Sequence, residues 1–297
     1  MVQFVRVNAV RTGDGAKTLE VVRDVASLRA KVREWRRQDE TVGLIPTMGA
    51  LHDGHLALVK AALDSCDHAV TTIFVNPTQF APNEDFEAYP RDEADDLFKL
   101  QALSADVVFV PPVEEMYADG FSTSVAVSGL TEGLCGATRP HFFGGVATVV
   151  SKLLLQALPD KAFFGEKDYQ QLQVVTRMAR DLDIPVEIVG VPTVREADGL
   201  AMSSRNWYLS PEERAAAPAL YKVLCDIAAK LSAGQTSAAA IAEGRTVLEA
   251  AGFGAIDYIE VCDASSLEPL ETADRPARVL AAAHLGRTRL IDNVAVG

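Results

Sequence analysis

The chain has 297 residues, which favours two domains because one domain usually contains roughly 100–200 residues. Hydrophobic residues make up 48% and charged residues 23%, as in globular proteins that bury a core. The net charge of −13 should repel a phosphate backbone, which argues against a general nucleic-acid binder. Apolar runs are too short for a membrane span, and residues 1–10 lack the features of a signal peptide.

The four cysteines lie far apart, at Cys66, Cys135, Cys225 and Cys262. They form no Cys-x-x-Cys pair and no zinc-like spacing. We therefore expect reduced, mostly buried thiols in a cytoplasmic protein, and no residue is assigned to a metal site.

Short apolar runs alternate with helical patterns over the first two thirds of the chain. The expected strands are 42–46, 69–75, 106–110, 162–165 and 186–191. Leu56, Val59 and Leu63 repeat at helical spacing, and three later segments (97–103, 149–156 and 174–182) do the same. This alternation predicts parallel strand pairing in a doubly wound α/β sheet.

The pattern changes beyond about Pro192. Two alanine-rich helical patterns, 212–232 and 237–251, precede strand-like runs at 258–261, 279–283 and 288–291. They predict a smaller α+β domain, so we expect one domain over 1–192 and another over 193–297.

Two histidines flank a glycine where the first expected strand leads into a helix. His52, Gly54 and His55 should lie at the carboxyl edge of the sheet, where open α/β sheets bind ligands. The N-terminus of a helix attracts anions, a glycine admits a base or ribose, and imidazoles can donate to phosphate. The segment therefore predicts a site for the phosphates of ATP.

Other interpretations of this loop are weaker. Gly49 and Gly54 have the glycine spacing of a P-loop, but His55-Leu56 stands where that motif needs Lys-Ser/Thr. Purely structural histidines are the plainer alternative. A metal site is disfavoured because no third ligand lies nearby in the sequence.

The loop also resembles a known superfamily. His52-Asp53-Gly54-His55 is similar to the His-x-Gly-His element of nucleotidylyltransferases and class I aminoacyl-tRNA synthetases. The longer segment 46–55 resembles the pantothenate synthetase (pantoate–β-alanine ligase) family, as do the blocks 73–80, 163–171 and 191–206. The resemblance covers nearly the whole chain and implies a Rossmann-like doubly wound sheet with a smaller C-terminal domain.

The resemblance implies a reaction in two steps. The carboxylate of (R)-pantoate would attack ATP, which carries Mg²⁺, to give pantoyl adenylate and pyrophosphate. The amine of β-alanine would then displace AMP and form pantothenate, a precursor of coenzyme A. The family is typically homodimeric, and neither a nucleic acid nor a membrane is implied as a partner.

Negative charge builds up on phosphate during this chemistry, so the site needs donors and cations. The resemblance implies that His55 is the proton donor. It also implies that Lys167 is a cation for the β- or γ-phosphate; the alternative for Lys167 is a surface salt bridge with Glu166 or Asp168. The segment 202–205 resembles the Lys-Met-Ser-Lys-Ser phosphate loop, although Ser203 and Ser204 alone would suggest a turn or an N-cap. The expected catalytic residues are His52, His55, Lys167, Ser203, Ser204 and Arg205.

The resemblance extends to the binding residues. The expected ATP-binding residues are Pro46, Thr47, Met48, Gly49, His52, Gly54, His55, Gly165, Glu166, Lys167, Asp168, Val194, Met202, Ser203, Ser204 and Arg205. The expected substrate-binding residues are Gln79, Gln171, Asn76 and Arg139. Neutral amides can hold hydroxyls and a carboxylate without the strong cation that would weaken the nucleophile.

One segment departs from the family pattern. Family members usually read Arg-x-Gly-His-Phe-x-Gly-Val, whereas this chain reads Arg139-Pro140-His141-Phe142-Phe143-Gly144-Gly145-Val146. Phenylalanine thus takes the position of the histidine, and His141 is left out of the expected site. A polar loop, 81–91, is expected to cover the pocket.

An acidic run then begins a predicted helix. Asp92, Glu93, Asp95 and Asp96 are expected to form a solvated face whose charge complements the helix dipole, with a metal site as the alternative.

Two other functions compete with the ligase. A nucleotidylyltransferase would need extra basic residues for a phosphate-ester acceptor, which Gln79 and Gln171 do not supply. A catalytically silent nucleotide-binding protein would be free to lose His52, His55 and Lys167, which are intact. An RNA-charging enzyme is excluded by the small size and the acidity of the chain.

Overall fold

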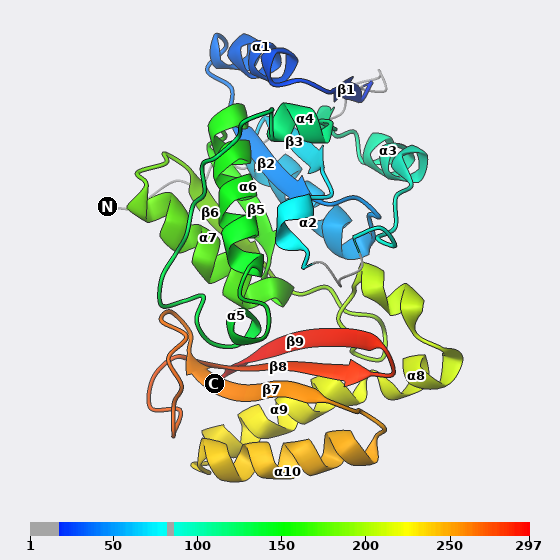
Figure 1. The fold of residues 1–297 in the computed structure, drawn as a ribbon, viewed down its shortest axis with the longest axis vertical. Helices are drawn as coiled ribbons and strands as arrows, with labels where there is room; N and C mark the ends of the chain where they lie inside the picture. The colour runs from blue at the N-terminus through cyan, green and yellow to red at the C-terminus, as the bar shows by residue number, and fades with distance from the viewer. Residues whose placement is uncertain (1–17, 82–85) are drawn as a thin grey trace.

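The larger sheet of the computed structural model has six parallel strands in the order β1-β4-β3-β2-β5-β6 (Figure 1). The structure describes residues 18–81 and 86–297, so the expectation for residues 1–10 lies outside them. The strands are β1 (Glu20–Val22), β2 (Val42–Thr47), β3 (His68–Ile73), β4 (Val107–Phe109), β5 (Lys161–Gly165) and β6 (Glu187–Val191).

Helices cover both faces of this sheet. The helices α1 (Val25–Arg36), α6 (Phe142–Ala157) and α7 (Tyr169–Asp181) pack on one face, and α2 (Asp53–Ser65) and α3 (Glu93–Ala102) on the other. Leu154 and Met178 belong to the first core, and Val59 and Leu100 to the second; all four are almost fully buried. The predicted doubly wound α/β sheet is confirmed.

The strand order creates a crevice between β2 and β5. From β2 the chain passes through α2 to β3 on one side, whereas from β5 it passes through α7 to β6 on the other. Because these connections diverge on opposite faces, the carboxyl ends of β2 and β5 are left open as a ligand-binding crevice. The histidine loop leaves the first of these strands.

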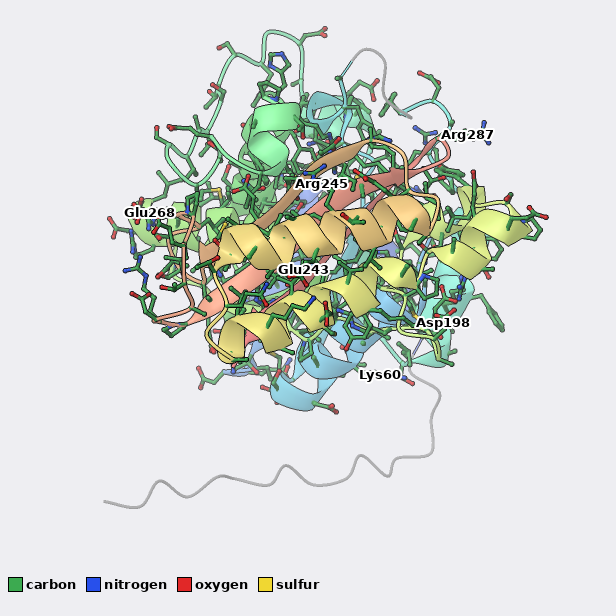
Figure 2. The ribbon with its side chains drawn as sticks, turned by 90° about the horizontal axis from the view of Figure 1, so that it is seen from below. Lys60, Asp198, Glu243, Arg245, Glu268 and Arg287 are labelled. Carbon is green, nitrogen blue, oxygen red and sulfur yellow. The ribbon has the colours of Figure 1, made fainter. Side chains whose placement is uncertain are left out.

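The smaller sheet is antiparallel and consists of β7 (Ile256–Asp263), β8 (Ala277–Leu285) and β9 (Thr288–Val296). The helices α9 (Ala219–Ser232) and α10 (Ser237–Ala250) lie side by side over its outer face (Figure 2). Lys230 of α9 pairs with Glu243 of α10 at 2.7 Å. The predicted α+β character of this region is confirmed.

The inner face of the smaller sheet packs against the first part of the chain. Tyr258, Cys262 and Leu280 share an apolar cluster with Leu130 and Phe143. This cluster lies beside the crevice, so the two sheets meet where ligands would bind. The domain boundary at residues 192 and 193 stays a prediction.

Two expectations about elements were wrong. The strand at Val42 is not the first, because β1 and α1 precede it; β1 has three residues and lies at the edge of the sheet. The single helix expected over 212–232 is broken into α8 (Pro211–Ala216) and α9, since Pro218 has no N–H to continue the first helix. Among the described residues, no helix is long and apolar enough to cross a membrane.

Candidate active site

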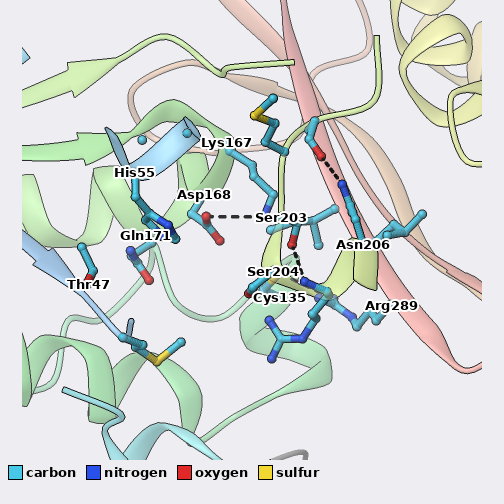
Figure 3. A pocket seen from close by; sticks show the side chains of 18 of the residues that line it. Thr47, His55, Cys135, Lys167, Asp168, Gln171, Ser203, Ser204, Asn206 and Arg289 are labelled. Atoms are coloured by element: carbon cyan, nitrogen blue, oxygen red, sulfur yellow. Dashed lines mark hydrogen bonds and ion pairs between the residues drawn. The ribbon is translucent and has the colours of Figure 1, made fainter. Parts of the chain in front are cut away.

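A cavity of about 820 Å³ opens at the carboxyl ends of β2 and β5 and reaches the hairpin of β8 and β9. All the residues expected to be catalytic or substrate-binding line it. Figure 3 shows Lys167, Asp168 and Gln171 on one side of this space and Ser203 and Ser204 on the other. The expected ATP-binding residues also line it, except Gly49 and Glu166. Segments far apart in the sequence thus meet in one cavity.

The loop between β2 and α2 has an unusual backbone. Gly49 and Ala50 have positive φ angles of 78° and 51°, which turn the chain sharply toward α2. The Asp96 carboxylate accepts hydrogen bonds from the N–H groups of Ala50 at 2.9 Å and Leu51 at 2.7 Å. A Cβ at Gly49 would lie 2.9 Å from this carboxylate, so Gly49 faces α3 rather than the cavity.

The expectation of a solvated acidic face was therefore wrong for Asp96. Only 1% of this residue is exposed, whereas its neighbour Asp95 pairs with Lys99 near the surface. Burial raises the pKa of Asp96, and its two backbone hydrogen bonds oppose that rise.

The two histidines are held by the start of α2. Nδ1 of His52 accepts from the N–H of Gly54 at 3.1 Å, and Nδ1 of His55 accepts from the N–H of His52 at 3.4 Å. Because Nδ1 is an acceptor in both rings, each neutral ring carries its hydrogen on Nε2. A Cβ at Gly54 would lie 2.8 Å from the His52 ring, so glycine also makes room for this imidazole.

Both rings are neutral at pH 7. Burial lowers the pKa of His52 to about 4, and nearby Lys167 acts in the same direction. Burial lowers the pKa of His55 to about 3, with smaller contributions from His52 and Lys167. The cavity is therefore offered neutral N–H donors, and the role of His55 as proton donor stays a prediction.

Lys167 lies in the short helix η2 (Glu166–Asp168) that follows β5. Its ammonium is 3.7 Å from the Asp168 carboxylate, and 20% of its side chain is exposed. The side-chain amide of Asn293 on β9 donates to the carbonyls of Glu166 and Lys167 at 2.9 and 3.0 Å. Glu166 instead pairs with Arg278 of β8 at 3.0 Å, which explains why it does not line the cavity.

The expected phosphate loop ends in the short helix η3 (Ser204–Tyr208). The Ser203 hydroxyl caps this helix by accepting from the N–H of Arg205 at 3.2 Å. The Ser204 hydroxyl is buried, 3.4 Å from the Tyr89 hydroxyl. Ser203 is thus an N-cap, as one alternative supposed, and it also lines the cavity. Tyr89 belongs to the loop expected to cover the pocket.

A buried ion pair ties the segment before this loop to β9. Arg195 donates to both oxygens of Asp292, at 2.7 and 2.9 Å, and 3% of the Asp292 side chain is exposed. The guanidinium carbon of Arg195 lies 3.7 Å from the centre of the Tyr221 ring. The N–H of Met202 donates to the carbonyl of Val194 at 3.0 Å, which closes the turn.

The expected substrate amides lie at the end of β3 and at the start of α7. Asn76 is 1% exposed and donates to Gln79 Oε1 at 3.1 Å and to the Gly145 carbonyl at 3.2 Å. Gln79 Nε2 contacts the Met48 sulfur at 2.8 Å. Asn76 therefore orients Gln79, while Gln171 lines the cavity from the first turn of α7.

Comparison with known proteins places this geometry in a family. The family model described as Pantoate-beta-alanine ligase matches residues 20–295. The chain is 59% identical over 278 residues to the pantothenate synthetase of Paramagnetospirillum magneticum, covering 94% of this chain and 98% of that protein. It is 56% identical to the pantothenate synthetase of Caulobacter vibrioides, covering 93% and 98%.

The chain belongs to the pantoate–β-alanine ligase family. The pantothenate synthetase of Thermus thermophilus has a similar fold, with a TM-score of 0.88, 49% identity, and coverage of 93% of this chain and 99% of that one. The Francisella tularensis ligase, solved with β-γ ATP and β-alanine, has a TM-score of 0.79 at 32% identity, covering 93% and 97%. The expected family, fold and enzyme class, a ligase, are confirmed.

The departure from the family pattern lies inside the cavity. Phe142 takes the position at which a histidine was expected, and its ring centre lies 4.0 Å from the guanidinium carbon of Arg139. Arg139 also donates to the carbonyl of Gln79 at 3.4 Å. The substitution therefore places an aromatic face against a cation beside the expected substrate amides. His141 is exposed and does not line the cavity.

The sequence predictions missed the contribution of the smaller sheet. Arg289 of β9 donates to Asp257 of β7 at 2.7 Å, and its Nη2 lies 3.5 Å from the Cys135 sulfur. All three residues line the cavity. No local motif marks them, because the partners come from separate elements. The four cysteines are free thiols, as expected, and three of them are buried.

Proposed function

We propose that this cavity condenses (R)-pantoate with β-alanine at the expense of ATP, through a pantoyl adenylate. The observation that carries the proposal is that four sequence blocks of the ligase family line one cavity at the sheet's open crevice. The complex of the Francisella relative with β-γ ATP and β-alanine supports the choice of substrates.

In the first step, a carboxylate oxygen of pantoate attacks the α-phosphorus, and the bond to pyrophosphate breaks. Lys167 and Arg205 are the cations that balance the charge on the phosphate oxygens. The Nε2–H groups of His52 and His55 donate hydrogen bonds to these oxygens, that of His55 to the departing pyrophosphate. Ser203 and Ser204 add hydroxyl donors.

Pantoate is held by neutral groups in this proposal. Gln79 and Gln171 bind its hydroxyls and carboxylate, while Asn76 fixes the orientation of Gln79. The absence of a full positive charge at the amides keeps the carboxylate nucleophilic. In the second step the β-alanine nitrogen attacks the acyl carbon, AMP leaves, and the amine loses a proton. Arg139 supplies a cation for an anionic end of a substrate.

Mg²⁺ enters the proposal with ATP, whose phosphate oxygens supply most of its ligands. Of the described residues, no group of three or more His, Cys, Asp or Glu side chains forms a metal cage. Three described carboxylates line the cavity; Asp257 and Asp292 are paired with arginines, whereas Asp168 lies beside Lys167. Asp168 is therefore the carboxylate that fits a shared Mg²⁺, which would neutralise phosphate charge.

We propose further that residues 193–297 form a domain that closes over ATP. Both sheets supply residues to the cavity, and the connecting residues Pro192, Thr193 and Val194 line it. Small-angle X-ray scattering should show a smaller radius of gyration with ATP and pantoate. Family membership supports a cytoplasmic homodimer, which light scattering of the purified protein tests.

The deciding assay measures pyrophosphate, AMP and pantothenate with ATP, Mg²⁺ and pantoate, with and without β-alanine. The proposal expects pantothenate only when β-alanine is present, and loss of pyrophosphate release in His55→Ala. Pyrophosphate release that ignores pantoate but responds to a phosphate ester would instead indicate a nucleotidylyltransferase. Tight ATP binding without turnover would indicate a silent relative.

A further inference from the structure

The histidine loop is held from outside the cavity by one helix. Asp96 of α3 accepts from the N–H groups of Ala50 and Leu51, and Lys99 of the same helix donates to the carbonyl of Leu51 at 2.6 Å. Asp96 does not line the cavity and so cannot touch the substrates. Three hydrogen bonds from α3 thus end on the two residues that immediately precede His52.

The backbone at this point needs such support. Ala50 has a φ angle of 51°, a left-handed conformation that is unfavourable for a residue with a side chain. Both oxygens of Asp96 are used, one for each N–H, and the residue is 1% exposed. An amide has only one oxygen, so its NH₂ group would face one of the two N–H donors. The site therefore specifically suits a carboxylate.

We propose that Asp96 is a positioning residue of the ligase: it clamps the left-handed turn at Ala50 so that His52 and His55 are aimed at the phosphates. The inference rests on the proposed function, because it assumes that the two rings stabilise charge that develops on phosphate. When hydrogen-bond donors are displaced from that charge, the transition state loses more stabilisation than the bound substrate does. The clamp therefore acts on kcat more than on KM.

The test compares Asp96→Asn with Glu93→Gln, an exposed residue of the same helix that pairs with Arg23. Both changes remove one negative charge from α3, but only the first reaches the loop. We expect Asp96→Asn to lower kcat by at least tenfold, with KM for ATP and pantoate within threefold of the wild type. Glu93→Gln should stay within twofold in both parameters.

NMR titration of the histidine rings supplies a reading that a loss of stability alone would not change. In folded Asp96→Asn, the midpoints of His52 and His55 should rise toward 6.5 as the loop opens to water. A kcat within twofold of the wild type, or unchanged midpoints, would overturn the clamp. If the wild type itself forms no pantothenate, the proposed function fails, while the midpoints still test the clamp.

A second variant covers the case in which Asp96→Asn does not fold. Lys99→Met removes the donor to the Leu51 carbonyl at a position that is 32% exposed, and it keeps the apolar stem. We expect it to lower kcat severalfold, with KM for ATP and pantoate within threefold of the wild type. A kcat within twofold of the wild type in Lys99→Met would then refute the inference.

Discussion

The two neutral histidines should make the protein less stable in acid. Their pKa values of about 4 for His52 and about 3 for His55 lie below the ordinary value of 6.5 of an unfolded chain. Between these values the unfolded chain binds protons that the folded protein does not. Their contribution to stability is therefore complete above pH 6.5 and is lost as the pH falls toward 4 and then 3.

The size of the effect follows from the pKa differences. At pH 5 an unfolded imidazole is mostly protonated, whereas both folded rings are mostly neutral. This difference is worth at most about 2 kcal/mol per histidine between pH 7 and pH 5. Both rings are partly exposed to the cavity, so water reduces their effect on the free energy of unfolding. We expect each histidine to contribute about 1–2 kcal/mol to the loss of stability between pH 7 and pH 5.

Urea unfolding at pH 7 and pH 5 measures this loss. Between the two pH values, the free energy of unfolding of the wild type should fall by about 2–4 kcal/mol more than that of the double variant His52→Gln/His55→Gln. The matched control is His141→Gln, since His141 is exposed and should leave the wild-type loss unchanged. Equal losses in the wild type and the double variant would refute neutral, buried rings and with them the N–H donors of the proposed mechanism.

Three further changes test separate parts of the site. Lys167→Met should lower kcat by about 10²-fold, because it removes a preorganised cation from the phosphates; steady-state kinetics measure this. Phe142→Leu removes the aromatic face against Arg139 and should raise KM for an anionic substrate about threefold, whereas Phe142→Trp should not. Asp292→Asn breaks the buried pair with Arg195 and should lower the free energy of unfolding in urea by about 3 kcal/mol.

Each of these changes has a control in the same chain. Lys161→Met alters a surface pair on β5, so an equal loss of kcat there would show that any lysine near β5 matters. Phe121→Leu removes the aromatic face near Lys152, and an equal rise in KM there would contradict the role of Phe142. Asp181→Asn breaks an exposed pair with Arg180 and should cost less than about 1 kcal/mol. Equal costs for Asp181→Asn and Asp292→Asn would show that burial of the second pair is unimportant.

The elements that could be predicted from sequence are those with a long, regular apolar pattern. The run at β2 is buried along nearly its whole length, and its expected bounds differ from the observed strand by one residue. The edge strand β1 has only three residues, too few for a period of two to be visible. The break at Pro218 could have been predicted, because a proline inside a helical pattern usually ends the preceding helix.

The burial of Asp96 also left a signal in the sequence. Asp96 lies four residues before Leu100, so both project from the same face of α3, the face that packs into the core. Asp95 lies on a different face and remains near the surface. Composition alone treats the four acidic residues as one group. Their positions around the helix distinguish Asp96, which is buried, from the other three.

Residues along the cavity were predicted where they stand together in one motif and missed where they do not. The histidines, Lys167 and the expected phosphate loop each belong to a continuous block. The pair Arg195 and Asp292 is separated by 97 positions, and Asp257 and Arg289 by 32. Only the folded chain brings such partners together, so no local spacing indicates them.

The charge of the cavity resolves an apparent conflict in the sequence. A chain with a net charge of −13 should repel polyanions, yet its proposed substrate is ATP. The charged side chains along the described cavity wall are five cations and three carboxylates: Arg139, Lys167, Arg205, Arg287, Arg289, Asp168, Asp257 and Asp292. Because the five cations outnumber the three carboxylates and His52 and His55 are neutral, the local balance is positive while the rest of the chain is acidic. Such a molecule attracts a compact anion at short range and still repels nucleic acid, whose charges extend past a screening length of about 10 Å.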